Sequence, residues 1–136
     1  MVAGDVPYTF EFRKIGNSSL GYISVAEGDY LPFPIGRVYW TYFTPDEVIR
    51  GNHAHKKLQQ VLVAVCGQVV VYTEDKCEVK REFILSKRNE GLFIPEGCWR
   101  TLRFSHDAVL LCIASAAFEE ADYIRTYEEF KNYIKQ

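Results

Sequence analysis

Short segments in which apolar and polar residues alternate follow one another along most of the chain. Alternation with a period of two places one set of side chains on each face of an extended backbone, so each segment predicts a β-strand. The segments are rich in Val, Ile, Tyr and Phe, as strands are. They cover residues 8–14, 20–28, 37–43, 60–67, 68–75, 77–86, 91–97, 98–105 and 108–115. About nine strands are expected, in an antiparallel arrangement rather than in β-α-β units.

Turn-forming residues separate several of these segments. Gly67, the Asp75-Lys76 pair and the Glu96-Gly97 pair each stand between consecutive segments. Glycine and aspartate are favoured in tight turns. We interpret all three positions as hairpin turns.

Only the end of the chain has apolar residues at helical spacing. Within residues 126–136, Tyr127, Phe130, Tyr133 and Ile134 fall on one stripe, which predicts a helix. Long apolar strands need their edges protected, and closing a double sheet into a barrel achieves this. The pattern therefore predicts an all-β fold, a closed barrel of the jelly-roll type with a short C-terminal α-helix.

Length and charge restrict the class of protein. The chain has 136 residues, 48% of them hydrophobic, which suits one compact core and a single domain over residues 1–136. A net charge of -2 offers no basic field for nucleic acid. No apolar run approaches the roughly 18 residues of a membrane span, and the first ten residues, MVAGDVPYTF, lack the regions of a signal peptide. We expect a cytoplasmic protein that binds neither nucleic acid nor membrane.

The cysteines give no sign of a cysteine-based site. Cys66, Cys77, Cys98 and Cys112 are spread along the chain without a CxxC pair or a short-spaced cluster. This spacing argues against a zinc knuckle and against a disulfide framework. Buried free thiols are expected instead.

The candidate chemistry lies in residues 50–60, RGNHAHKKLQQ, which hold two of the three histidines of the chain. Because His53 and His55 are two residues apart, a strand would point both imidazoles to the same face. A lone histidine in a strand is usually a hydrogen-bonded scaffold residue, whereas two on one face beside an arginine form a cluster that can exchange protons or bind anions. His106 lies among polar residues in a predicted turn, so we assign it to the surface.

Two motifs resemble those of the cupins, which are jelly-roll barrels. Gly51, His53 and His55 match the first cupin motif, and the second is matched by Gly91, Pro95 and Gly97. The acid of the first motif is replaced by Gln59 and the third histidine of the second by Arg100. A guanidinium cannot ligate a cation and repels one, and an amide adds no charge. We therefore predict no metal ion at this site.

A closer resemblance covers about three quarters of the chain. The chain is similar to the sugar 3,4-ketoisomerases that act on dTDP-4-keto-6-deoxyglucose in the synthesis of 3-amino-3,6-dideoxyhexoses. The similar segments are residues 37–71, which include RGNHAHKKLQQ, residues 91–102, and residues 122–134, which begin with DYIR. The RGxHAHKKLxQ segment is the most specific part. The resemblance implies a cupin-type barrel without metal or other cofactor, usually a homodimer, whose substrate is a dTDP-linked 4-keto-6-deoxy sugar.

The same resemblance suggests roles for individual residues. It implies that His53 is the base at the sugar carbon, that His55 relays a proton or orients the sugar, and that Tyr39 donates to a sugar oxygen. Arg100 would stabilise an enediolate or bind the diphosphate, as guanidinium groups commonly do with oxyanions. Arg37, Arg50 and Gln59 are the further expected substrate contacts, although ordinary surface pairing explains the two arginines nearly as well.

Other readings and details stay open at this point. A non-catalytic nucleotide-sugar-binding cupin is the alternative, and retention of His53, His55 and Tyr39 argues against it because binding alone does not require two titrating groups. A metal-dependent cupin dioxygenase or epimerase-like enzyme is opposed by Gln59 and Arg100. The sequence does not decide which residues hold thymine. It also does not decide whether the 3-keto product has the gluco or the galacto configuration, and Arg100 is the first position that we would examine for this.

The N-terminal segments suggest an assembly. A barrel made of the remaining strands need not accommodate residues 8–14 and 20–28. We therefore predict a homodimer in which this N-terminal part adds to a sheet edge of the partner.

Overall fold

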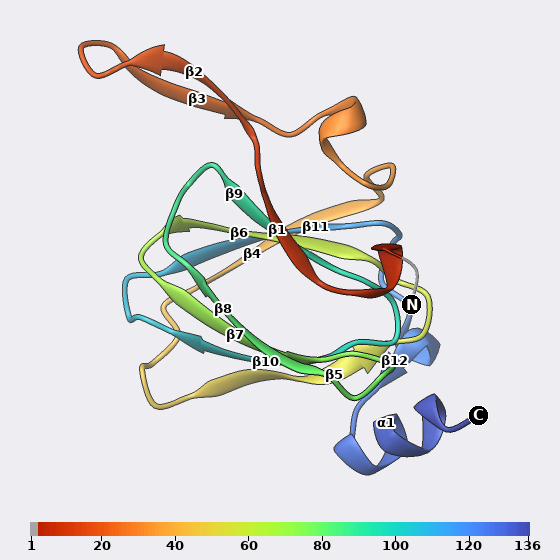
Figure 1. The fold of residues 1–136 in the computed structure, drawn as a ribbon. Helices are drawn as coiled ribbons and strands as arrows, with labels where there is room; N and C mark the ends of the chain where they lie inside the picture. Colours follow the sequence, from red (N-terminus) through yellow and green to blue (C-terminus); the bar gives the residue numbers. More distant parts are fainter. Residues whose placement is uncertain (1–2) are drawn as a thin grey trace.

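Two five-stranded antiparallel sheets face each other in the computed structural model, which describes residues 3–136 (Figure 1). The first sheet has the strand order β1-β9-β6-β11-β4, and the second has the order β12-β5-β10-β7-β8. The strands are β1 (Tyr8–Glu11), β2 (Arg13–Asn17), β3 (Gly21–Val25), β4 (Arg37–Tyr42), β5 (Ile49–His55), β6 (Gln60–Cys66), β7 (Val69–Glu74), β8 (Lys80–Leu85), β9 (Glu90–Ile94), β10 (Trp99–Phe104), β11 (Val109–Ala114) and β12 (Tyr123–Ile124). The helices are three short 3-10 turns, η1 (Ala3–Asp5), η2 (Gly28–Tyr30) and η3 (Glu120–Asp122), and the α-helix α1 (Tyr127–Ile134).

Strands that are consecutive in the chain mostly belong to different sheets, as in a jelly roll. The turns at Gly67, between β6 and β7, and at Glu96-Gly97, between β9 and β10, pass from one sheet to the other, so the prediction of hairpins there was wrong. Asp75-Lys76 does join a paired hairpin, β7-β8. Glycine and aspartate favour a tight hairpin turn within one sheet and equally a tight connection from one sheet to the other. The local sequence therefore does not distinguish these two kinds of connection.

The predicted all-β class of the jelly-roll type is confirmed, but the two sheets form an open sandwich and are not closed into a barrel. The strand orders end at β1 and β4 in one sheet and at β12 and β8 in the other. Most predicted strands are present with shifted ends, but residues 8–14 form two strands, β1 and β2, because β1 pairs with β9 and β2 pairs with β3. The strand β5 was missing from the nine alternating segments because most of its residues are polar or glycine.

The core has three parts that explain the sequence pattern. Between the sheets lies a cluster that includes Leu62, Leu92 and Leu102. A second cluster lies where the N-terminal segment, through Phe12 and Phe33, packs on the first sheet. The strand β6 contributes to both clusters, so it is apolar along nearly its whole length. Each buried side chain of this size contributes about 1.5–3 kcal/mol to folding.

The third cluster attaches α1 to the outer face of the second sheet, as predicted from the helical stripe. Phe130 is fully buried against Ala54 of β5 and Ile124 of β12. The helix begins with a cap in which the hydroxyl of Thr126 accepts a hydrogen bond from the backbone amide of Glu129 at 3.1 Å. The C-terminal segment is therefore fastened to the part of β5 that carries the histidines.

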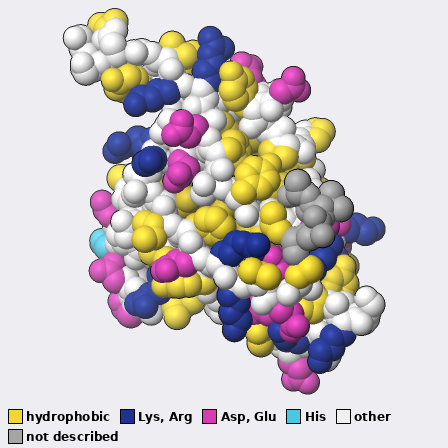
Figure 2. All heavy atoms as spheres, in the orientation of Figure 1, with side chains coloured by type: hydrophobic (Ala, Val, Ile, Leu, Met, Phe, Trp, Pro, Cys, Tyr) yellow, Lys and Arg dark blue, Asp and Glu magenta, His cyan; other side chains and the backbone are white. Residues whose placement is uncertain are grey.

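The β2-β3 hairpin projects from the body of the molecule (Figures 1 and 2). Its two strands pair only with each other among the described residues. Leu20 at its turn is 87% exposed and Ile23 is 64% exposed. The strand β1, which belongs to the same N-terminal part, joins the sheet of its own chain.

Other sequence predictions are settled by burial. All four cysteines lie in the described part of the chain and are free; Cys98 and Cys112 are buried, whereas Cys77 is exposed. His106 is exposed, as predicted. No helix within residues 3–136 is both long enough and apolar enough to span a membrane.

Candidate active site

A β-bulge in β5 sets the direction of the histidines. Arg50 of β5 lies opposite Leu102 of β10, and His53 lies opposite Arg100. Between these two pairs β10 has one residue, which pairs with Gly51, whereas β5 has two, so Asn52 is the extra residue of the bulge. Residues directly opposite each other in an antiparallel pair share a face. Without the extra residue, Asn52 would face inward beside Arg100 and His53 would face outward. The bulge thus brings His53 onto the inner face, which is a common use of bulges near active sites.

Glycine at position 51 is required by this bulge. The backbone of Gly51 has a φ of 84°, in the region that favours glycine. A Cβ atom there would lie 2.7 Å from Cδ1 of Leu102 and 2.9 Å from the carbonyl oxygen of Arg100. The Arg-Gly that precedes the HxH pair is therefore part of the geometry that aims the pair.

The two imidazoles lie side by side, which confirms that the HxH spacing places both on one face. Their ring centroids are 4.8 Å apart and the rings meet edge to face. Nδ1 of His53 is 3.1 Å from the carbonyl oxygen of Gly51. Since a carbonyl oxygen only accepts, Nδ1 carries the proton and Nε2 of His53 is left as an acceptor.

Both histidines are neutral at physiological pH. Burial is the main cause that lowers the pKa of His53 to about 3 and the pKa of His55 to about 2, and the positive charge of Arg100 lowers both further. A neutral imidazole can accept a proton, whereas an imidazolium cannot.

Arg100, Gln60 and Tyr39 form a hydrogen-bonded chain beside the histidines. The Nε and Nη2 atoms of Arg100 donate to the carbonyl oxygen of Cys98 at 3.2 and 3.0 Å, and Nη1 donates to Oε1 of Gln60. Nε2 of Gln60 donates to the hydroxyl of Tyr39 at 3.0 Å. Arg100 is only 2% exposed, and burial lowers its pKa. The guanidinium is thereby fixed inside the sandwich.

Tyr39 stays protonated although its ring is 37% exposed. Desolvation of the hydroxyl, together with the neighbouring Cys112, raises the pKa of Tyr39 well above its usual value. The hydroxyl oxygen of Tyr39 accepts from Gln60, and its O–H points to the thiol of Cys112. A substrate oxygen could receive this O–H in place of the weakly accepting sulfur.

All but one of the predicted site residues line two hollows. The first, of about 90 Å³, is lined by Tyr39, Thr41, Arg50, Gly51, His53, Gln60, Leu62, Arg100, Leu102, Phe104, Leu110 and Cys112. The second, of about 190 Å³, is lined by Arg37, His55, Lys57, Leu58, Ser115, Ala116, Ala117, Glu119, Asp122 and Tyr123. The two arginines expected to bind the diphosphate are thus separated, with Arg50 in the first hollow and Arg37 in the second.

Gln59, which the motif comparison selected as a substrate contact, lines neither hollow. Its backbone amide donates to the hydroxyl of Ser115 at 2.9 Å. The next residue, Gln60, is 2% exposed and makes the inward contacts. The motif comparison selects a position by its spacing along the chain. Which of the two adjacent glutamines points inward is decided by the pairing of β6 with its neighbouring strands.

Tyr123 and Asp122, in the DYIR segment, were not assigned a role from the sequence. The ring centroid of Tyr123 lies 4.3 Å from that of His55 and 5.1 Å from that of His53. Oδ2 of Asp122 is 3.3 Å from Nδ1 of His55. The two-residue pairing of β12 with β5 places both side chains. The signal available in the sequence was the specificity of the DYIR motif itself.

The donor set does not suit a metal ion. Within residues 3–136, no group of three or more His, Cys, Asp and Glu side chains is placed to bind one. His53 lies opposite Arg100, whose guanidinium would repel a cation.

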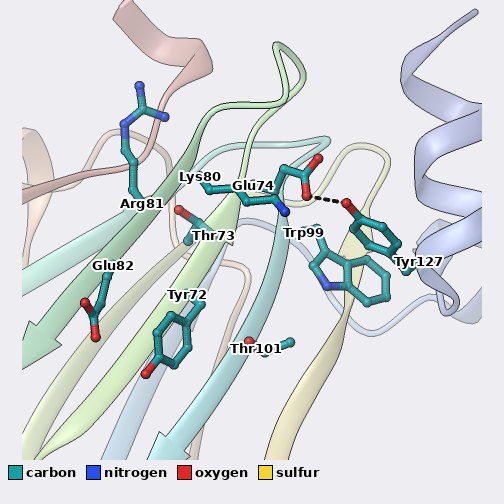
Figure 3. Close-up of a pocket in the computed structure, with 9 residues that line it drawn as sticks. All are labelled: Tyr72, Thr73, Glu74, Lys80, Arg81, Glu82, Trp99, Thr101 and Tyr127. Carbon is teal, nitrogen blue, oxygen red and sulfur yellow. Dashed lines mark hydrogen bonds between the residues drawn. The ribbon is translucent and has the colours of Figure 1, made fainter.

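A shallower hollow of about 420 Å³ lies on the outer face of the second sheet (Figure 3). Figure 3 shows Trp99 and Tyr127 at one end of it, where the hydroxyl of Tyr127 donates to Glu74 at 2.7 Å. Trp99 and Arg100 are neighbours on β10 and point to opposite faces. This hollow therefore lies across the sheet from the histidines, and it contains none of the predicted site residues.

Residues 7–135 match the family FdtA, described as WxcM-like, C-terminal. A TDP-4-oxo-6-deoxy-alpha-D-glucose-3,4-oxoisomerase from Aneurinibacillus thermoaerophilus is 40% identical over 124 residues, which are 90% of this chain and 88% of the relative.

Solved structures of similar sequence have the same fold. A 3,4-ketoisomerase from Helicobacter canadensis is 34% identical with a TM-score of 0.89, covering 96% of this chain and 98% of that one. QdtA, a sugar 3,4-ketoisomerase from Thermoanaerobacterium thermosaccharolyticum solved with TDP, is 31% identical with a TM-score of 0.90, covering 99% and 97%. A histidine-to-asparagine variant of QdtA has been solved with TDP-4-keto-6-deoxyglucose.

Proposed function

The chain belongs to the FdtA family of WxcM-like proteins, and from this premise we propose that it is a TDP-sugar 3,4-ketoisomerase, an isomerase that acts on TDP-4-keto-6-deoxyglucose. The relatives at 40% and 31% identity are enzymes of this activity. The observation that carries the proposal is a pair of neutral imidazoles inside the sandwich, next to a buried guanidinium and a protonated tyrosine.

The reaction moves a carbonyl group from C4 to C3 of the sugar. The proton on C3 is acidified by the neighbouring ketone and is removed, and negative charge then develops on the oxygen of C4. The resulting enediolate gains a proton at C4 while the oxygen on C3 loses its proton to become the new carbonyl. The protein must supply a base, a donor to the developing oxyanion and a path for the protons.

His53 is the proposed base at C3. It is neutral, and its Nε2 is the free acceptor because Nδ1 donates to Gly51. His55, with its ring centroid 4.8 Å away, is proposed to relay the proton or orient the sugar. Tyr39 can donate its hydroxyl hydrogen to a sugar oxygen, and the guanidinium of Arg100 can stabilise the enediolate.

The nucleotide half of the substrate is proposed to bind through arginines. Arg37 has a buried Nε without a hydrogen-bond partner among the described residues, and Arg50 is exposed at the first hollow. Guanidinium groups pair well with phosphate oxygens. We include both in the diphosphate contact, and we omit Gln59 because its side chain lines neither hollow.

The protein is further proposed to be a cytoplasmic homodimer. The exposed apolar residues of the β2-β3 hairpin supply a surface for a second copy. A TDP-linked sugar carries charged phosphates that do not cross a bilayer unaided, so the enzyme is expected where such sugars are made.

Incubation with TDP-4-keto-6-deoxyglucose in deuterated water tests the activity. We expect a 3-keto product that carries deuterium at C4. His53→Asn keeps size and hydrogen bonding but cannot accept a proton at neutral pH, so it should abolish turnover, with TDP-sugar affinity changed only a few-fold. In the relative QdtA, one histidine-to-asparagine variant has been solved with TDP-4-keto-6-deoxyglucose, so such a replacement can leave substrate binding intact in that protein.

Two outcomes would contradict the proposal. Tight binding without any conversion by the unmodified protein would indicate a nucleotide-sugar-binding cupin instead. Turnover by His53→Asn at close to the original rate would show that His53 is not the base.

A further inference from the structure

Asp122 is held rigidly against the segment that follows His55. Its Oδ1 accepts a hydrogen bond from the backbone amide of Lys57 at 2.8 Å, and Oδ2 accepts one from the amide of Leu58 at 3.1 Å. Its own carbonyl oxygen accepts from the amide of Lys56 at 2.9 Å. Three successive amides therefore orient this residue, which is the last of the 3-10 turn η3.

The same carboxylate faces the ring of His55. Oδ2 lies 3.3 Å from Nδ1 of a histidine that is 1% exposed. Neither ring nitrogen of His55 has a hydrogen-bond partner within the described residues. A buried polar atom without a partner costs about 1–3 kcal/mol, so such an atom in a functional hollow points to a role in the reaction.

Most of the other charges around His55 are positive; Lys57 and the carboxylate Glu119 also line its hollow, but Glu119 makes no ion-pair contact with the ring. Arg100 of β10, Arg37 of β4 and Arg125, which follows β12, act on it as cations, and His53 and the ring of Tyr123 are neutral neighbours. In the part of the chain that the structure describes, Asp122 is the one carboxylate in ion-pair contact with a histidine. It is therefore the group placed to favour a proton on the His55 ring.

The contact also decides which nitrogen of His55 carries the proton. Oδ2 lies 3.3 Å from Nδ1 without meeting the geometry of a hydrogen bond, but its negative charge still repels a bare lone pair on the nearby Nδ1. A proton on Nδ1 turns the repulsion into attraction. A neutral imidazole has one N–H, so Nε2 is then the nitrogen that can accept.

We infer that Asp122 is a positioning residue that holds His55 in the Nδ1–H tautomer, so that Nε2 is the atom that takes up and returns a proton. This rests on the proposed function, because it supposes that His55 relays protons in the isomerisation. When Nε2 accepts a proton, the imidazolium is stabilised by the adjacent carboxylate, in the way that a buried aspartate supports the histidine of a hydrolase triad. Asp122 acts through His55 and not on the substrate directly.

The substitution Asp122→Asn separates this role from a purely structural one. The side-chain oxygen of asparagine can keep the shorter hydrogen bond, from the amide of Lys57 at 2.8 Å, and its NH₂ group then takes the place of Oδ2 and loses the hydrogen bond from the amide of Leu58. That group donates to Nδ1 of His55, so Nε2 must carry the ring proton and can no longer accept one. We expect kcat to fall by about 10²-fold or more, with KM changed only a few-fold.

Nitrogen-15 NMR of the histidine rings, without substrate, provides a second readout. The chain has three histidines, so His53→Asn and His106→Asn identify the His55 signals. In the unmodified protein we expect Nδ1 of His55 to be protonated and Nε2 unprotonated, and in Asp122→Asn the reverse. The matched control is Asp107→Asn, whose carboxylate accepts from the hydroxyl of Ser105 in the turn between β10 and β11. It should leave both kcat and the His55 signals unchanged.

The outcomes separate the two proposals. Asp122 does not position His55 if Nε2 of His55 is protonated in the unmodified protein. The same conclusion follows if Asp122→Asn lowers only the melting temperature and leaves the tautomer and kcat unchanged. If Asp122→Asn does not fold, the tautomer of the unmodified protein still decides. If the unmodified protein binds the sugar nucleotide without isomerising it, the proposed function fails, while the ring signals still report whether Asp122 selects the tautomer.

Discussion

His53 and His55 are basic side chains whose surroundings oppose a positive charge. Burial and the fixed guanidinium of Arg100 lower the pKa of both, so each is a neutral proton acceptor in the resting protein. Arg100 is in turn held by Cys98 and Gln60, which means that its charge stays at one place while charge develops on the sugar. A low resting pKa favours return of the proton to carbon.

These pKa values predict a loss of stability in mild acid. The folded protein keeps both histidines neutral, whereas in the unfolded chain they take up protons below their ordinary pKa of about 6.5. The unfolded state thus binds more protons, and stability falls as the pH falls. Between pH 8 and pH 5 the loss is about 2 kcal/mol for each histidine.

Chemical denaturation at several pH values measures this effect. His53→Asn should remove its share of the pH dependence, whereas His106→Asn, at an exposed turn position, should not. A free energy of unfolding that stays constant from pH 8 to pH 5 would contradict the assignment of two buried neutral histidines.

Among the elements, β5 and β12 act together. The bulge at Gly51 and Asn52 turns His53 inward, and β12 pairs with the far end of β5, at Ala54 and His55. The helix α1 then covers Ala54 from the outer side through Phe130. The imidazoles are thus fixed by a bulge on one side and by the C-terminal segment on the other.

Gly51→Ala tests the bulge. The left-handed φ and the approach to Leu102 and the Arg100 carbonyl should together destabilise the fold by about 1–3 kcal/mol. Because the strain is relieved by moving His53, the isomerisation rate should fall more than TDP binding does. Gly4→Ala is the matched control, since a Cβ atom there would meet nothing within 4 Å. Equal melting temperatures and rates for the two variants would show that the bulge tolerates a side chain.

At the scale of the whole molecule, the unusual feature is the β2-β3 hairpin. Two strands with no neighbouring sheet are marginally stable in water by themselves. The exposed Leu20, Tyr22 and Ile23 would normally be covered. A second copy of the chain is the proposed cover.

Light scattering at micromolar concentration should give about twice the 15.7 kDa mass of one chain. The double substitution Leu20→Ser and Ile23→Ser should shift the protein toward monomer. Ile84→Ser is the control, because Ile84 is 56% exposed on β8 and is not part of the hairpin. A monomer formed by the unmodified chain would contradict the homodimer.

The presence of most strands, the terminal helix and the placement of His53 and His55 on one face follow from the sequence, because each depends on the spacing of residues within a few positions. The direction of that face was decided by the tertiary structure, since one extra residue opposite β10 reverses which side chains point inward. The same holds for the choice of Gln60 over Gln59 and for the crossing of Gly67 between sheets. Asp122 and the Lys57 amide that it accepts from are 65 residues apart, and only the pairing of β12 with β5 brings them together. Local spacing determines alternation, whereas the partner strand determines register, and the chemistry of this site depends on register.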